Sequence, residues 1–130
     1  MIQASFRTRR NDRERIRQTI CNRSRAFERI DRYLDEGYEK VRGMSSRFAA
    51  AICGHIVRRQ TELGIQGDIA EVGTFEGRFF IALALGLAAG ENAVGFDTFD
   101  WPNERVLDRF LAHCERNGLA KDRFVAWKAN

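Results

Sequence analysis

The chain has 130 residues, 44% of them hydrophobic and 31% charged, and a formal net charge of +4. These values are typical of one globular domain with a modest core, and they exclude disordered and fibrous proteins. The three cysteines form neither a CxxC pair nor a metal-ligand spacing, which gives no support to a disulfide framework or a structural zinc site.

The longest apolar run, residues 79–89, is much shorter than the roughly 20 residues that a membrane-spanning helix needs. The arginine-rich start of the chain has no apolar stretch behind it, so it does not resemble a secretory signal. We therefore expect a cytoplasmic protein without a membrane span.

Residues 1–66 are expected to form an N-terminal helical region. Apolar residues at helical spacing predict one helix over about 12–36 and a second that starts near Ser45 and Ser46 and ends at Gly64. The first 42 residues hold 12 basic and 7 acidic side chains, interleaved at helical separations as on a solvated helix surface. The aromatic interleaving of base-stacking surfaces is missing, so we expect no nucleic-acid partner. The apolar members of the second helix are Phe48, Ile52, Ile56 and Leu63.

Residues 67–130 alternate short apolar segments with amphipathic ones, which is typical of βαβ units and a parallel sheet. Because crossovers between parallel strands are right-handed, the strands should lie in the spatial order 3-2-1. We therefore expect an α/β fold, a Rossmann-like three-layer sandwich with a partial parallel sheet preceded by helices. Strands are predicted at 69–72, 93–96 and 124–127, and helices at 77–89 and 103–117.

Two features lie at the carboxyl ends of the predicted strands, where ligands bind in such sheets. After the first strand, Gly73 permits a sharp turn and Gly77 lets the next helix pack closely. After the second, Asp97 lies 20 residues beyond Gly77 (97 − 77), where a carboxylate can accept hydrogen bonds from both hydroxyls of a ribose. This spacing predicts a nucleoside-binding site.

The residues of the first turn discriminate between nucleosides. A dinucleotide site needs glycine at the position of Phe75, and Glu76 would repel a pyrophosphate. S-adenosylmethionine has no phosphate and carries a cationic sulfonium and an ammonium group, which a nearby carboxylate such as Glu71 favours. Arg78 is expected to face solvent, and Trp101 either covers an adenine or packs against the protein.

The segment IAEVGTFEG, residues 69–77, resembles the first motif of class I S-adenosylmethionine-dependent methyltransferases, acidic-x-Gly-x-x-x-Gly. The segment VGFDTFD, residues 94–100, is similar to the acidic second-strand motif of a branch that includes macrocin-type sugar O-methyltransferases. The resemblance covers about residues 67–130. It implies cofactor contacts by Glu71, Gly73, Thr74, Phe75, Gly77, Asp97, Thr98 and Phe99.

In this family the two glycines would flank the methionine part of S-adenosylmethionine, and Glu71 would support its polar groups. Asp97 would hold the ribose, and Thr98 and Phe99 would border the adenine. The resemblance implies O-methylation of a small molecule, such as a hydroxyl group of a sugar or of a natural-product scaffold.

A complete class I methyltransferase continues past the third strand to at least four more, so residues 67–130 correspond to a first half, cut after the third strand. No catalytic base can be named, and some relatives hold a divalent cation through later residues, for which no ligands are visible here. The first strand, central in a complete sheet, would become an edge with unpaired backbone groups. Such an edge predicts a homodimer or a partner chain.

Two alternatives stay open. One is half of an NAD-dependent oxidoreductase, against which Phe75 and Glu76 argue. The other is a non-catalytic interaction module or an inactive fragment, in which the charged N-terminal helix and the open sheet edge bind another protein.

Overall fold

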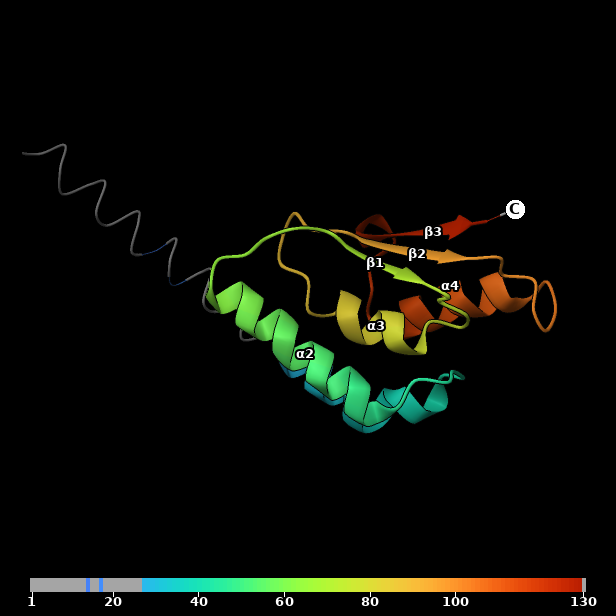
Figure 1. Ribbon diagram of the computed structural model, residues 1–130, viewed down its shortest axis with the longest axis horizontal. Helices are drawn as coiled ribbons and strands as arrows, with labels where there is room; N and C mark the ends of the chain where they lie inside the picture. The colour runs from blue at the N-terminus through green and yellow to red at the C-terminus, as the bar shows by residue number, and fades with distance from the viewer. Residues whose placement is uncertain (1–13, 15–16, 18–26, 130) are drawn as a thin grey trace, which may run out of the picture.

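The computed structural model describes residues 14, 17 and 27–129 (Figure 1). A three-stranded sheet carries helices α3 and α4 on one side, and helix α2 packs against α3 farther from the sheet. No helix among the described residues combines the length and the apolar character needed to cross a membrane.

Residues 27–32 form a helix. It is followed by a π-helical turn, Tyr33–Gly37, and by a 3-10 turn, Tyr38–Lys40. The hydroxyl of the buried Tyr33 donates a hydrogen bond to the carbonyl oxygen of Arg78 at 2.9 Å. The helix expected over residues 12–36 is thus helical in its later part, and most of 12–26 lies outside the described residues.

Helix α2, Arg47–Glu62, begins where the sequence predicts. Ser46 is its N-cap, and the Oγ of Ser46 accepts a hydrogen bond from the backbone N–H of Ala49 at 3.1 Å. The helix ends just before Gly64, which adopts a φ of 75°.

The burial of α2 is inverted relative to an ordinary amphipathic helix, because small residues face inward and large apolar residues face solvent. The small residues permit close approach: a Cβ on Gly86, after α3, would lie only 3.0 Å from Val57 of α2. The buried residues of α2 are Ala50, Gly54 and Thr61, and its exposed large apolar residues are Phe48, Ile52 and Ile56, with Leu63 at its C-cap.

The sheet contains β1 (Ile69–Val72), β2 (Ala93–Asp97) and β3 (Phe124–Lys128), all parallel, with β2 in the centre. Helix α3 (Arg78–Ala84) connects β1 to β2, and α4 (Val106–Arg116) connects β2 to β3 after a short loop. The predicted strands, their order 3-2-1 and the α/β fold are confirmed. Helix α3 ends earlier than predicted, because the backbone tightens into a turn where the N–H of Gly86 bonds to the carbonyl of Leu83 at 3.0 Å.

The face of the sheet that meets α3 and α4 forms the core. Four phenylalanine rings interlock there: the ring centroids of Phe80 and Phe110 lie 5.1 Å apart, and those of Phe99 and Phe110 lie 5.4 Å apart. Phe124 of β3 adds a third contact to Phe110 at 5.8 Å. This aromatic cluster fixes α4 beneath β2 and β3.

The opposite face of the sheet is apolar and is left uncovered by the described elements (Figure 1). Val72, Phe96 and Trp127 are neighbours across the three strands, and Val72 is 86% exposed. Side chains alternate between the two faces along each strand, so Ala70, Val94 and Val125 lie on the same face as these three residues. We call the surface formed by these six residues the bare sheet face.

Candidate functional site

The turns that follow β1 and β2 meet at a pocket with a volume of about 510 Å³. Three segments line it: the turn after β1 and the start of α3, the turn after β2, and residues 39–44 from the region before α2. The lining residues are Glu39, Val41, Arg42, Gly43, Met44, Gly73, Phe75, Arg78, Asp97 and Trp101.

The carboxylate of Asp97 joins the two turns. Its Oδ2 accepts a hydrogen bond from the backbone N–H of Phe75 and its Oδ1 accepts one from that of Phe99, each at 2.8 Å. Phe75 and Phe99 have φ values of 51° and 52°, a left-handed conformation that is unfavourable for residues other than glycine. Asp97 therefore stabilises two strained backbone positions while its side chain also lines the pocket.

The two glycines of the first turn serve different needs. Gly73 has a φ of 84°, and a Cβ built there would meet no atom within 4 Å, so the backbone at Gly73 is open to a ligand. Gly77 has a φ of 91°, and its Cβ would lie 2.9 Å from Cδ2 of Phe110. Gly77 thus permits α3 and α4 to pack closely and does not line the pocket.

Glu71 of β1 holds a carboxyl group in an unusual environment. Burial, with a smaller contribution from the nearby Asp97 carboxylate, raises the pKa of Glu71 to about 7. Its Oε2 is buried and has no hydrogen-bond partner among the described residues. A buried acceptor without a donor is unfavourable, and a cationic or donor group of a ligand would satisfy it.

Five of the predicted contact residues are not among those that line the pocket: Glu71, Thr74, Gly77, Thr98 and Phe99. Thr74 is buried, and its hydroxyl donates to the carbonyl of Phe96 at 3.3 Å. Thr98 is exposed and donates to Asp100 at 2.6 Å, and the ring of Phe99 is fully buried in the core. A cofactor contact by these residues stays a prediction.

Residues 39–44 were not assigned to the site by sequence reasoning, and Arg78 holds them there. The Nε of Arg78 donates to the carbonyl of Tyr38 at 3.1 Å and its Nη1 to that of Gly43 at 3.0 Å, while Nη2 pairs with Glu39. The expectation that Arg78 faces solvent is wrong, since its side chain is only 15% exposed. Gly43 lies against Arg78, where a Cβ would be 2.7 Å from that of Arg78, but the sequence pattern contains no signal of this contact.

Glu76 also differs from its expected role. Its side chain is 1% exposed and pairs with Arg109 at 2.7 Å and with Arg42 at 3.7 Å. Because these two cations neutralise its charge, Glu76 is not the group that would repel a pyrophosphate at this turn. Phe75, which stands where a dinucleotide site needs glycine, is therefore the residue of this turn that disfavours a dinucleotide.

Trp101 forms an aromatic wall together with Phe75, with ring centroids 5.9 Å apart. The indole is 69% exposed, so it borders the pocket and does not pack into the core. Within the described part of the chain, no group of three or more metal-ligating side chains comes together.

Comparison with protein-family models and with curated proteins finds no match. The O-methyltransferase from Bacillus cereus in complex with S-adenosylhomocysteine (SAH) is similar in structure, with a TM-score of 0.53 and 22% sequence identity. The alignment covers 78% of this chain and 41% of that one. A proposed O-methyltransferase from Klebsiella pneumoniae gives a TM-score of 0.50 at 18% identity and covers 75% and 41% of the two chains. The chain therefore spans about two-fifths of the length of these neighbours and has their Rossmann-like α/β fold.

Proposed function

We propose that the chain binds S-adenosylmethionine in the pocket between the two turns and forms the donor side of an O-methyltransferase. The observation that carries this proposal is the carboxyl of Glu71, whose buried Oε2 has no hydrogen-bond partner among the described residues and which lies near Asp97, a residue that lines the pocket together with Gly73. The fold shared with an O-methyltransferase in complex with SAH supports the same assignment.

The residues around the pocket suit this cofactor, which supplies a methyl group on a positively charged sulfur. Asp97 lines the pocket and Glu71 lies near it, and these carboxylates favour a cationic ligand. Phe75 and Trp101 offer aromatic surface to an adenine. Asp97 would hold the ribose through the acceptor capacity that its two backbone hydrogen bonds leave free.

The acceptor is proposed to be a hydroxyl group of a small molecule, such as a sugar or a natural-product scaffold. Transfer requires that hydroxyl to be positioned in line with the sulfonium and deprotonated by a base. Because the chain spans about two-fifths of its structural neighbours, the complete reaction is proposed for the protein or assembly that contains it. A divalent metal, implied by some relatives, stays a prediction.

The test is calorimetric titration with S-adenosylmethionine, SAH and NAD of the wild-type chain and of two glycine variants. Gly73→Ala and Gly90→Ala introduce the same side chain at φ values of 84° and 89°, with no atom within 4 Å of either Cβ. The two changes therefore impose matched backbone strain, and only Gly73 lines the pocket.

We expect saturable binding of S-adenosylmethionine and SAH that Gly73→Ala abolishes and Gly90→Ala preserves. Tighter binding of NAD would instead support the oxidoreductase alternative. The charge of Glu76 does not argue against NAD as the sequence suggested, because Glu76 pairs with Arg109. Absence of binding by all three compounds, or equal loss in both variants, would contradict the proposed cofactor site. Asp97→Ala is a poorer test because it also removes the hydrogen bonds that hold both turns.

We also propose that β1 and the bare sheet face bind a second polypeptide, either another copy of this chain or a partner that adds strands. β1 has a neighbour on one side only among the described strands, and Val72 at this edge is largely exposed. An open edge beside an apolar surface favours strand addition.

A further inference from the structure

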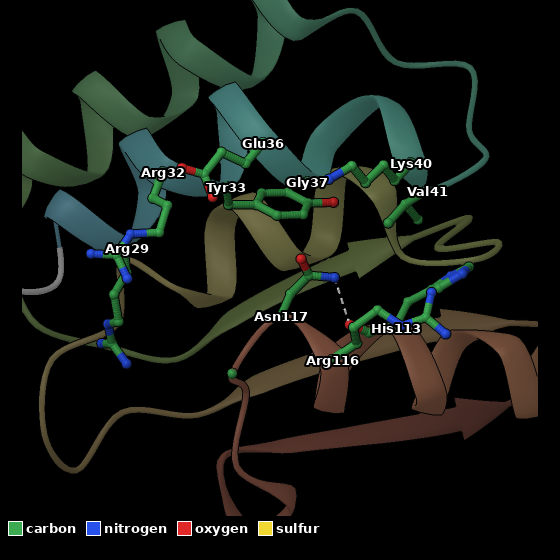
Figure 2. A pocket seen from close by; sticks show the side chains of 11 residues that line it. Arg29, Arg32, Tyr33, Glu36, Gly37, Lys40, Val41, His113, Arg116 and Asn117 are labelled. Atoms are coloured by element: carbon green, nitrogen blue, oxygen red, sulfur yellow. Dashed lines mark hydrogen bonds between the residues drawn. The ribbon is translucent and has the colours of Figure 1, made fainter.

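A second pocket lies on the helical side of the chain, between residues 29–41 and the end of α4 (Figure 2). Its volume is about 470 Å³. Val41 is the one residue that lines both this pocket and the candidate cofactor site. We call this second cavity the basic pocket, because Arg29, Arg32, Lys40 and Arg116 line it.

The positive charge of the basic pocket is not compensated within the described part of the chain. Glu36 is the single carboxylate among the lining residues, against the four basic side chains of Arg29, Arg32, Lys40 and Arg116. No carboxylate in the described residues pairs with Arg32, Lys40 or Arg116. Six arginines elsewhere do pair with acidic side chains: Arg42, Arg47, Arg58, Arg59, Arg78 and Arg109.

The cations are distributed over the two ends of the basic pocket. Figure 2 shows Arg29 and Arg32 on one side, His113 and Arg116 on the other, and Asn117 between them. A ligand that uses both ends must therefore carry two separated anionic groups. Arginine suits phosphate in particular, because its planar guanidinium can donate two parallel hydrogen bonds to one group.

The centre of the basic pocket is tightly built. The side-chain amide of Asn117 donates to the carbonyl oxygen of His113 at 2.8 Å, which fixes its orientation. A Cβ on Gly37 would lie 2.7 Å from Oδ1 of Asn117 and 2.6 Å from the ring of Tyr33, so only glycine fits there. The ring of His113 is also held, with its Nδ1 3.1 Å from the carbonyl oxygen of Glu76.

We infer that the basic pocket binds a small polyhydroxylated molecule with a phosphate group at each end. Arg29 and Arg32 would bind one phosphate, and Arg116 would bind the other. Glu36 and Asn117 offer acceptors to hydroxyl groups of the part between them. This inference does not depend on the proposed methyl transfer, because the two pockets are lined by different charged residues.

The probe is fructose 1,6-bisphosphate, titrated calorimetrically into the complete chain at about 0.15 M NaCl, where long-range attraction is largely screened. We expect saturable binding to one site, at least about tenfold tighter than that of inorganic phosphate. The double variant Arg32→Gln with Arg116→Gln should weaken the affinity for the bisphosphate by at least about tenfold.

The matched control is Arg105→Gln with Lys128→Gln, which removes the same net charge from two exposed residues that do not line the basic pocket. It should leave the affinity within about twofold, since remote charges are screened. Thermal unfolding of both variants establishes that they are folded. Failure of the wild-type chain to bind, an equal loss in the control, or saturable binding of a single-stranded RNA in place of the bisphosphate would overturn the inference.

Discussion

The carboxylate of Asp97 has a structural task in addition to any contact with a ligand. Asp97→Asn should lower the free energy of unfolding by about 1–3 kcal/mol, because asparagine offers an acceptor to only one of the two N–H groups that it faces. The side-chain NH2 group of the asparagine would face the N–H of either Phe75 or Phe99, and two donors form no hydrogen bond. Urea unfolding followed by circular dichroism measures the change.

The control for this prediction is Asp100→Asn, which removes the same charge from an exposed side chain that bonds to Thr98. Its free energy of unfolding should stay within about 0.5 kcal/mol of the wild type. Equal stabilities of Asp97→Asn and the wild-type chain would show that the two left-handed residues do not depend on Asp97.

The buried carboxyl of Glu71 makes a pH dependence predictable. Its pKa is 4.5 in a solvated chain and about 7 in the folded protein, so the folded state retains a proton that the unfolded state releases. The stability that this proton contributes is full below about pH 4.5 and is lost as the pH rises through about 7. Glu71→Gln should therefore be more stable than the wild type at about pH 8, by up to about 3 kcal/mol.

Urea unfolding of both proteins between about pH 4.5 and pH 8 checks this, because the difference between them isolates Glu71 from other titrating groups. The difference should be small at the acid end and grow with pH. A constant difference would contradict the raised pKa. A cationic ligand bound to ionised Glu71 would, for the same reason, bind more tightly above about pH 7 than below it.

Residues whose roles depend on backbone geometry were predictable from the sequence, and residues whose roles depend on distant partners were not. The turn geometry of Gly73 and the strand-end position of Asp97 follow from their spacing to the predicted strands. By contrast, the environments of Glu76 and Arg78 are set by Arg109 and Tyr38, which lie 33 and 40 residues away in the chain. Nothing in the local pattern indicates these contacts.

The segment 38–44 reaches the pocket because one side chain of α3 holds it. Arg78→Lys should release this segment, since lysine cannot bond at once to the carbonyls of Tyr38 and Gly43 and to Glu39 in the fork geometry of arginine. Amide hydrogen exchange in residues 38–44 should increase severalfold, and exchange in α4 should stay unchanged. Arg105→Lys, at an exposed position, is the control.

Unchanged exchange in residues 38–44 would mean that Tyr38, whose hydroxyl bonds to Ser45 at 2.7 Å, is sufficient to hold the segment. A uniform increase over all elements would instead indicate global destabilisation, and the specific role of Arg78 would be contradicted. Either result would contradict the specific role of Arg78, while residues 39–44 would still line the pocket.

Helix α2 shows what hydrophobic spacing can and cannot predict. Its start, its Ser46 cap and its end near Gly64 followed from the sequence, because capping and glycine termination are local properties. Which side of α2 is buried did not follow. Small residues allow α2 to approach Ile30 and Gly86 closely, and this contact leaves Phe48, Ile52 and Ile56 exposed.

The order of the three strands was predictable because chirality and connection rules leave few arrangements for a chain that alternates strands and helices. The open edge of β1 was expected from the resemblance and not from these rules, and β1 does lie at an edge among the described strands. The bare sheet face was not predictable, since its extent depends on which surfaces α2, α3 and α4 cover. Apolar residues on this face, including Val72 and Trp127, form a larger exposed patch than isolated surface residues would.

The exposed edge and face together predict association. The purified wild-type chain should elute as a dimer or larger species by size-exclusion chromatography with light scattering, because strand addition at β1 pairs free backbone groups and covers Val72. Val72→Lys should shift the population towards the monomer, since a buried lysine at the new interface would lose its hydration.

The matched control is Leu111→Lys, which makes the same change of character at an exposed apolar residue of α4, on the helical side of the sheet. It should leave the association state unchanged. If the wild-type chain is a monodisperse monomer, the proposal for the β1 edge fails. If both lysine variants dissociate the assembly equally, the added charge acts through general repulsion. That result would contradict the proposal that β1 is the binding surface.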